Sequence, residues 1–369
     1  MMAELLISTA VCMLLPTMPL WLMDTENMSA QETGIVMGSF ALGLFSLGCL
    51  CSWLVQRYRR NVVCMWAVAA LGADLALLWY VDSLRSEFVE LSLAVVQRFC
   101  LGAFFGLAQM VLTSTLIIDT CESDKRTEAN YSASWFARFA LSLGPLAGLI
   151  TYGYLGFSGV LLASIGCAAV SVLLIRNVAF PFRAPDDSVS VVSLDRFFLP
   201  HAMPLFLNLL LVTTAVGLLL SMPLTVVFYA LMMCGFLLAV LAQRFVFREA
   251  ELKSEVVTGL ILLLAAQLIV YNYSLSPLAP VLTGLGAGLV GSRFLLFFIK
   301  LSRHCKRGTS QSTYFLGWEA GLAIGIGLGY GLLYGGPEQL LELSMSLTAV
   351  SLAVYHFFTH SWFVNNKNR

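Results

Sequence analysis

Gly48–Tyr58 reads GCLCSWLVQRY, and Gly235–Phe245 repeats its pattern as GFLLAVLAQRF. Each stretch ends an apolar segment with a glycine, a small residue four positions later, and a Gln-Arg pair followed by an aromatic residue. Further matches follow in the same order: Lys125-Arg126 with Lys306-Arg307, Gly144 with Gly325, and Gly148 with Gly329. Agreement in order and in position indicates an internal duplication, so two equivalent halves are expected.

The composition excludes an ordinary water-soluble protein. The 369 residues are 59% hydrophobic and 11% charged, whereas soluble domains are about 45–50% apolar and about 25% charged. The formal net charge of zero gives no excess of basic residues for binding nucleic acid. The nine cysteines lie mostly in apolar segments and show no Cys-x-x-Cys spacing, which indicates buried hydrophobic side chains rather than a metal site or disulfides.

Apolar windows of about 20 residues, the length at which a helix crosses about 30 Å of hydrocarbon, occur along most of the chain. Twelve are found, at 3–23, 33–54, 61–81, 89–118, 130–152, 156–177, 203–221, 223–243, 255–273, 278–300, 312–334 and 340–362. The expected fold is therefore an all-α integral membrane protein, with twelve transmembrane helices in two six-helix bundles related by a pseudo-twofold axis.

The Lys and Arg residues predict the orientation. When the loops are assigned alternately to the two faces, the outer face receives only Arg85, three bases fall within spans, and all others share the second face. Because Lys and Arg concentrate in cytoplasmic loops, the second face and both termini are expected to be cytoplasmic in a multi-pass cell-membrane protein. The expected parts are an N-terminal bundle at 1–177, a cytoplasmic linker at 178–202, and a C-terminal bundle with a short cytoplasmic tail at 203–369.

Two charged residues inside spans become equivalent through the duplication. The repeat aligns Arg138 of the fifth span with Glu319 of the eleventh. A charge in the bilayer interior costs at least about 2.5–3.5 kcal/mol, so neither side chain is expected to face lipid. We expect both to line a central cavity, either paired directly or each binding a polar substrate. A fixed buried ion pair with a structural role is the alternative.

The twelve spans, the duplication and the central linker resemble the major facilitator superfamily of secondary transporters over the whole chain. Ser52–Asn61, SWLVQRYRRN, resembles the family's signature between helices 2 and 3, but Gln56 replaces the aspartate and Arg59 the second glycine. In the family that aspartate is held at the start of helix 11 as a cytoplasmic gate, and the signature arginine pairs with an acid at the end of helix 4. The resemblance therefore implies gating roles for Gln56, Arg57 and Arg60, for Asp119 as the acid, and for Gln243 and Arg244 in the second half.

Arg98 and Gly102 match the family's helix 4 signature, an arginine followed four residues later by a glycine. The resemblance implies that Arg98 takes part in proton transfer. At helical spacing Gly106, Gln109 and Thr113 continue the same face, which is expected to form a cavity wall. The alternative is that Arg98 extends to the outer membrane interface.

Gly144, Pro145 and Gly148 resemble a helix 5 element of the family that is typical of antiporters. The resemblance implies export. Close helix packing alone is the alternative, because small residues spaced by four allow helices to approach each other.

Other polar residues inside the spans are expected to act locally. Asn208 is a candidate for the pathway or for a hydrogen bond between helices, Asp74 for a local partner, and Arg293 for extension to the nearer interface.

These features predict a secondary transporter that moves a small organic solute by alternating access of two rocking halves, without a cofactor and as a monomer. Proton-coupled export by antiport is the most specific version. In it Glu319 carries the proton, because a substrate that competes for Arg138 would promote protonation of the carboxylate. No acid lies in the middle of the first span, where many antiporters of the family keep one, so a facilitator or uniporter and a sugar-type symporter stay open.

Two other classes of protein have less support. A membrane enzyme would need His, Asp or Cys groups that converge near one interface, and the four His residues are dispersed. His356 and His360 have a spacing that can bind metal, but no third ligand is evident, so no metal site is expected. A transporter-like sensor that has lost transport is supported only by the altered signature at Gln56 and Arg59.

Overall fold

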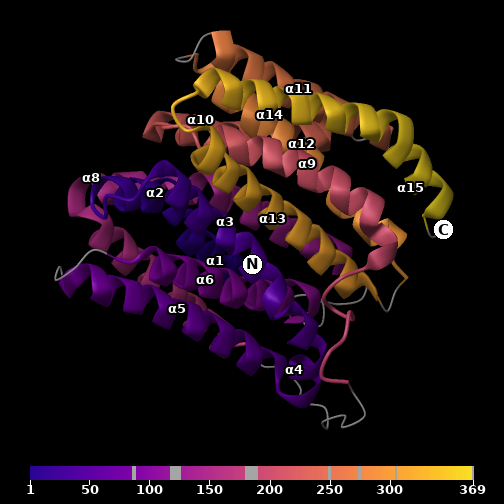
Figure 1. Cartoon of the computed structure of the whole chain (residues 1–369). Coiled ribbons are helices and arrows are strands. Elements are labelled where there is room, and N and C mark those ends of the chain that lie inside the picture. The colour runs from indigo at the N-terminus through magenta and orange to yellow at the C-terminus, as the bar shows by residue number, and fades with distance from the viewer. Residues whose placement is uncertain are drawn as a thin grey trace.

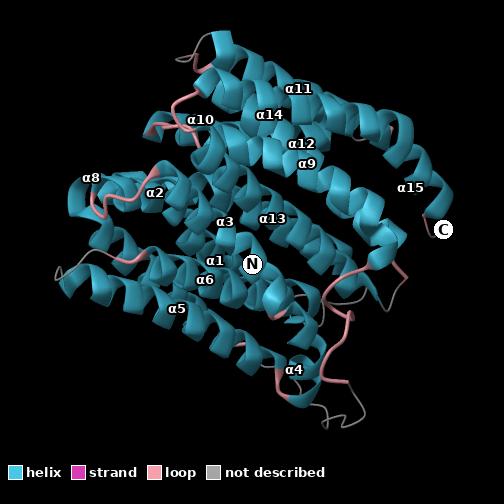
Figure 2. Cartoon of the chain, in the orientation of Figure 1, coloured by secondary structure: helices cyan, strands magenta, loops and turns pink. Residues whose placement is uncertain are grey.

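The structure is a computed structural model that describes residues 1–84, 89–116, 126–178, 190–247, 251–272, 276–303 and 306–367, the side chains of 126–131 and of residue 333 excepted. These residues form helices joined by loops, and none of them lies in a strand (Figure 2). The all-α prediction is confirmed.

The first half of the chain runs from indigo to magenta in Figure 1. Its elements are α1 (Met2–Cys12), α2 (Leu14–Asp24), α3 (Ala30–Ser46), η1 (Gly48–Leu50), α4 (Cys51–Arg57), α5 (Arg60–Leu84), α6 (Leu91–Val111), η2 (Leu112–Leu116) and α8 (Arg126–Arg176). The helices α1 and α2 form one span that is interrupted at Met13. The interruption follows from Pro16, which has no N–H to donate to the carbonyl of Cys12.

The second half runs on to yellow in Figure 1. Its elements are η3 (Pro200–Ala202), α9 (Met203–Leu220), α10 (Val226–Phe245), α11 (Leu252–Asn272), α12 (Leu278–Leu301), α13 (Arg307–Leu333), α14 (Pro337–Val354), η5 (Tyr355–Thr359) and α15 (His360–Asn366).

Within the described residues, 11 helical stretches are long and apolar enough to cross a membrane. The difference from twelve arises in α8, where 132–176 is one continuous stretch. Gly156 has φ 67° and ψ −167° inside it, so the helix changes direction there. The predicted spans 130–152 and 156–177 lie on either side of this glycine, and the structure thus agrees with the expected membrane fold.

Local sequence sets several helix starts. Ser29 and Glu32 form a capping box at the start of α3, in which each side chain bonds the backbone N–H of the other residue. Thr225 accepts from the backbone N–H of Phe228 at the start of α10. Pro337 opens α14, where its missing N–H costs nothing.

Helices from the two halves meet along two seams. The first half packs α1 on α8 and α3 on α6, the second packs α9 on α13 and α10 on α12, and between them α3 lies against α13 and α8 against α10. Figure 1 shows the two groups of helices side by side, with the segment that leads into α9 passing between them. The domain boundaries at 177 and 203 stay a prediction.

The seam between α3 and α13 brings backbone against backbone. A Cβ atom at Gly34 would lie 2.3 Å from the backbone nitrogen of Gly331, and one at Gly327 would lie 2.8 Å from the Cα of Gly38. Gly331 lies about 33 Å along α13 from Thr309 near its start. The close contact is therefore at the far end of the bundle from the start of α13.

Candidate functional site

A cavity lies between the two halves. Four elements line it: α1 and α8 of the first half, η2 that follows α6, and α13 of the second half. The lining residues are Glu4, Thr113, Ser134, Ala137, Arg138, Gln311, Tyr314, Phe315, Trp318 and Glu319. Both residues that the duplication aligned, Arg138 and Glu319, are among them.

Arg138 is 1% exposed, and its guanidinium makes hydrogen bonds and a contact with an aromatic ring. Its Nε donates to the Ser134 carbonyl at 3.0 Å and its Nη2 to the Ser134 hydroxyl at 2.6 Å. Its Nη1 donates to the carbonyl of Gly288 in α12 at 3.2 Å, and the guanidinium lies 4.2 Å from the Trp135 ring centroid. Arg138 therefore joins α8 of the first half to α12 of the second.

Glu319 is partly buried on α13 and lines the cavity. No ion pair between Glu319 and Arg138 occurs in the structure, which describes both side chains, and the arginine bonds Ser134 and Gly288 instead. Of the two arrangements expected from the sequence, the direct pair is absent. Both side chains line the cavity.

Glu4 is an acidic residue of the cavity that the sequence did not indicate as part of the site. It lies in the first turn of α1, is 1% exposed, and its Oε2 has no hydrogen-bond partner among the described residues. The side chain of Gln109 is beside it, and Gln109 donates to the Ser8 hydroxyl at 2.8 Å. The signal in the sequence is an acid inside the first apolar window, near the start of that window rather than in its middle.

Arg98 lies in the interior rather than at a membrane interface. It is 1% exposed, and its Nε and Nη1 have no hydrogen-bond partner among the described residues. Its guanidinium lies 4.8 Å from the Phe40 ring centroid. Arg98 does not line the cavity of Glu319, so the structure separates these two predicted pathway residues. The alternative of extension to the interface is wrong.

Gly102, Asp74 and Asn208 have roles in packing and bonding between helices. A Cβ at Gly102 would lie 2.4 Å from the Phe40 carbonyl oxygen, so this glycine lets α6 approach α3. Asp74 accepts from Gln97 at 2.9 Å. Asn208 donates to the Ser351 carbonyl at 3.1 Å and accepts from its hydroxyl at 3.3 Å, which ties α9 to α14. None of the three lines the cavity.

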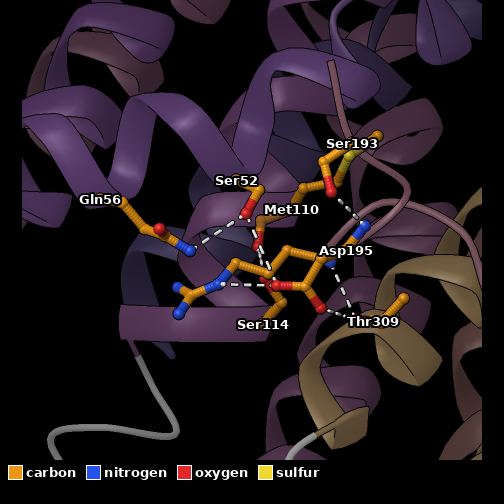
Figure 3. A network of polar contacts seen from close by, with 8 residues as sticks. Ser52, Gln56, Met110, Ser114, Ser193, Asp195 and Thr309 are labelled. Carbon is orange, nitrogen blue, oxygen red and sulfur yellow. Dashed lines mark hydrogen bonds and ion pairs between the residues drawn. The ribbon is translucent and has the colours of Figure 1, made fainter. Parts of the chain in front are cut away.

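The predicted gating residues of the first half lie beside the segment that leads into the second half. Gln56 donates to the Ser52 hydroxyl at 3.2 Å, and Ser52 donates to Oδ2 of Asp195 at 3.5 Å. Thr309 of α13 donates to Oδ1 of Asp195 at 3.1 Å, so Asp195 lies between α4 and α13 (Figure 3). Gln56 thus reaches the start of α13 through Ser52 and Asp195.

The three other gating residues predicted in the first half have no described part in this contact. Arg57 is exposed, with its guanidinium 5.6 Å from the Trp53 ring centroid, and Arg60 begins α5. Asp119, the predicted partner of the signature arginine, lies outside the described residues.

In the second half, Gln243 belongs to a buried polar cluster. It donates to Glu255 and to the Ser292 hydroxyl, and Arg293 forms an ion pair with Glu255. Glu255, in the first turn of α11, therefore holds Arg293 between α11 and α12. Arg244 is exposed, with its guanidinium 5.9 Å from the Phe245 ring centroid.

Gly144, Pro145 and Gly148 are buried in α8 and face the interruption of the first span. A Cβ at Gly144 would lie 2.5 Å from the Cβ of Cys12, and one at Gly148 would lie 2.5 Å from the Met13 carbonyl oxygen. The element predicted from the family thus packs α8 against the junction of α1 and α2.

Comparisons with solved structures show the fold. The human organic anion transporter MFSD10 superposes with a TM-score of 0.68 at 16% identity, over 96% of this chain and 97% of that one. The nucleoside transporter NupG gives 0.67 at 12% identity, over 96% and 98%. The E. coli fucose:proton symporter FucP gives 0.65 at 14% identity, over 96% and 97%.

Sequence comparison adds the family. A search of curated protein sequences finds no match. The family model of the Major Facilitator Superfamily matches residues 1–250, which is more than half of the chain. With its helical composition and its fold, this match identifies a multi-pass membrane protein of a transporter family rather than an enzyme. The chain belongs to the major facilitator superfamily.

Proposed function

We propose that this protein is a secondary active transporter that moves a small organic solute by alternating access, in exchange for protons and in the direction of export. The observation that carries the proposal is the cavity itself, which is lined by Glu4 and Arg138 from the first half and by Glu319 from the second. A solute bound there contacts both halves, so rocking of one half against the other changes the side to which the solute is open.

Glu319 is the proposed proton carrier. Its carboxylate lines the cavity and bonds no described residue, so it is available both to a proton and to a solute. Arg138 is the proposed solute contact from the opposite wall, where Ser134 and Gly288 hold its guanidinium in place. Export is supported by the resemblance of Gly144, Pro145 and Gly148 to the antiporter element. Cytoplasmic termini and a monomeric state belong to the same proposal.

The proposal is tested with purified protein in lipid vesicles that contain a pH-sensitive dye. Candidate solutes are added under an imposed pH gradient, and solute movement and proton movement are recorded together. We expect solute movement that depends on the gradient in the unaltered protein, and loss of this dependence in Glu319→Gln, whose amide cannot carry a proton. Glu338→Gln on exposed α14 is the matched control and should keep the dependence.

The alternative mechanisms give different results in the same vesicles. Movement of solute without proton movement in the unaltered protein would indicate a facilitator, and movement of both in one direction would indicate a symporter. Unchanged gradient dependence in Glu319→Gln would contradict the assignment of Glu319 as the proton carrier.

A further inference from the structure

We propose that residues 190–199, here called the latch, hold the linker end of the molecule closed, and that the contact of the Phe197 ring with Gly48 is the one that opens. When the two halves separate at that end, the latch stays with the second half and leaves the first. This role rests on the proposed function, because only a protein whose halves rock has an end that opens and closes.

The latch is attached to the second half through buried hydrogen bonds. The backbone N–H of Arg196 donates to the Thr309 hydroxyl and that of Leu199 to the Thr313 hydroxyl, each at 2.8 Å. Thr309 and Thr313 are four residues apart, so their hydroxyls lie on one face of α13. Both threonines and Leu199 are buried. Breaking such a bond leaves a buried group without a partner, so these bonds are expected to persist when the halves separate.

The attachment to the first half centres on the ring of Phe197. A Cβ atom at Gly48 would lie 2.1 Å from this ring, so the ring occupies space that is free only because Gly48 has no side chain. The ring also meets Phe45 of α3 edge to face, with 6.4 Å between the centroids. Beside it the N–H of Ser193, which is only partly buried, donates to the Cys49 carbonyl. This side of the latch is therefore the one that can separate.

The internal duplication provides a comparison for Gly48 within the molecule. Gly48 corresponds to Gly235 of α10, where a Cβ atom would lie 2.2 Å from the carbonyl oxygen of Val281 in α12. Gly235 thus serves helix packing inside one half, which is kept while the halves rock. Gly48 instead receives the ring of Phe197, from the segment that leads into the other half. A contact between the halves has to break at one stage of alternating access.

The backbone of the latch is strained at the residue between its two attachments. Arg196 has φ 60°, in the left-handed region that residues with a Cβ rarely adopt. Its nitrogen is bonded to Thr309 and the next residue is Phe197, so the left-handed turn lies between the contact with the second half and the contact with the first. Strain of this kind persists only where surrounding contacts hold it. Release of the ring from Gly48 frees this turn, which favours opening.

The test is a distance measurement at the linker end of the purified full-length chain in lipid, at one pH and without a solute. Spin labels are placed on cysteines that replace exposed Tyr58 and Lys306, and the native cysteines are replaced. Phe197→Ala deletes the ring, and Gly48→Ala fills its space. We expect each variant to raise the ratio of the longer to the shorter distance by about fivefold, as expected for the loss of one aromatic contact.

Phe198→Ala is the matched control. Phe198 is the next residue, is also partly buried, and its ring lies 5.1 Å from that of Phe206 in α9, within the second half. Its loss should leave the ratio of distances unchanged. The double variant Gly48→Ala/Phe197→Ala should show the ratio of either single variant rather than the product of the two changes, because both remove the same contact.

An unchanged ratio in Phe197→Ala or in Gly48→Ala, an equal change in Phe198→Ala, or independent effects in the double variant would overturn the proposal. The two single variants act on opposite sides of the contact, so one is informative even where the other fails to fold. Failure of the latch is distinct from failure of the proposed function. An unchanged ratio beside proton-coupled movement in vesicles contradicts the latch alone, whereas a shifted ratio in a protein that moves no solute contradicts the proposed transport alone.

Discussion

Glu255 and Arg293 show how a buried charge is compensated by an opposite charge inside the second half. Glu255 is completely buried in α11, Arg293 is 16% exposed in α12, and the two form an ion pair to which Gln243 adds a hydrogen bond. Removing one partner of such a pair leaves the other charge buried and uncompensated, which costs about 3–5 kcal/mol.

We therefore expect Glu255→Ala to lower the free energy of unfolding by about 3–5 kcal/mol, as measured by thermal or denaturant unfolding in detergent. Glu338→Ala, which removes an exposed carboxylate, should change it by less than about 0.5 kcal/mol. The double variant Glu255→Gln/Arg293→Gln should lose less free energy of unfolding than Glu255→Gln and Arg293→Gln lose together as single variants, because the two charges disappear together. Additive effects would contradict the coupling of the pair.

At the same scale, the sequence could predict some site residues but not others. Arg138 and Glu319 could be found because a charge inside an apolar span is rare and the duplication aligns the two positions. Glu4 was missed because it lies near the start of its window, where an acid is ordinary at a membrane interface. Its burial depends on how α1 packs against α8, which no local pattern in the sequence expresses. The partners of Arg138 in α8 and α12 depend on packing in the same way.

Among the elements, the segment 190–199 before α9 forms several hydrogen bonds with its neighbours. The backbone N–H of Ser193 donates to the Cys49 carbonyl at 3.0 Å, that of Arg196 to Thr309 at 2.8 Å, and that of Leu199 to Thr313 at 2.8 Å. Asp195 joins this set through Ser52 and Thr309 (Figure 3). The segment 190–199 is therefore bonded to both halves of the molecule.

Asp195→Ala removes the side-chain bonds of this segment and leaves its backbone bonds. Asp195 is 45% exposed, so we expect the loss to be small, about 1 kcal/mol, and confined to this region. Hydrogen exchange should become about fivefold faster at the amides of Arg196 and Leu199. Asp24→Ala, on an exposed aspartate at the end of α2, is the control and should leave these amides unchanged. Equal exchange in both variants would show that Asp195 does not hold the segment.

The positions of the spans could be predicted well, because length and hydropathy determine them. The breaks within spans could be predicted less well, because backbone geometry determines those. Apolar windows of bilayer length located the spans, since a membrane helix must bond its own backbone throughout. They could not show how the chain turns between the spans predicted at 130–152 and 156–177, because the turn depends on the positive φ of Gly156. Windows also gave no sign of the interruption at Met13, although Pro16 is its local cause.

For the whole molecule, the two halves approach each other closely at Gly308 and Ser114 near the linker, where a Cβ at Gly308 would lie 2.5 Å from the Ser114 carbonyl oxygen, and again at the end of the bundle away from the linker. There α3 meets α13 with backbone contact at Gly34 and Gly331, while the segment 190–199 bridges the halves at the opposite end. Alternating access requires that these two ends open in turn. The duplication predicted two equivalent halves, but how closely the halves approach at each end depends on packing that the repeat does not encode.

The most direct test of the account is a distance measurement between spin labels at both ends of the bundle. Cysteines replace exposed Tyr58 and Lys306 at the linker end in one protein, and exposed Leu84 and Tyr334 at the far end in another. The nine native cysteines are removed from both. When the pH is changed from acidic to alkaline in lipid, we expect two populations at each end whose proportions shift in opposite directions. A single unchanged distance at both ends under both conditions would contradict a transporter whose halves rock around the cavity.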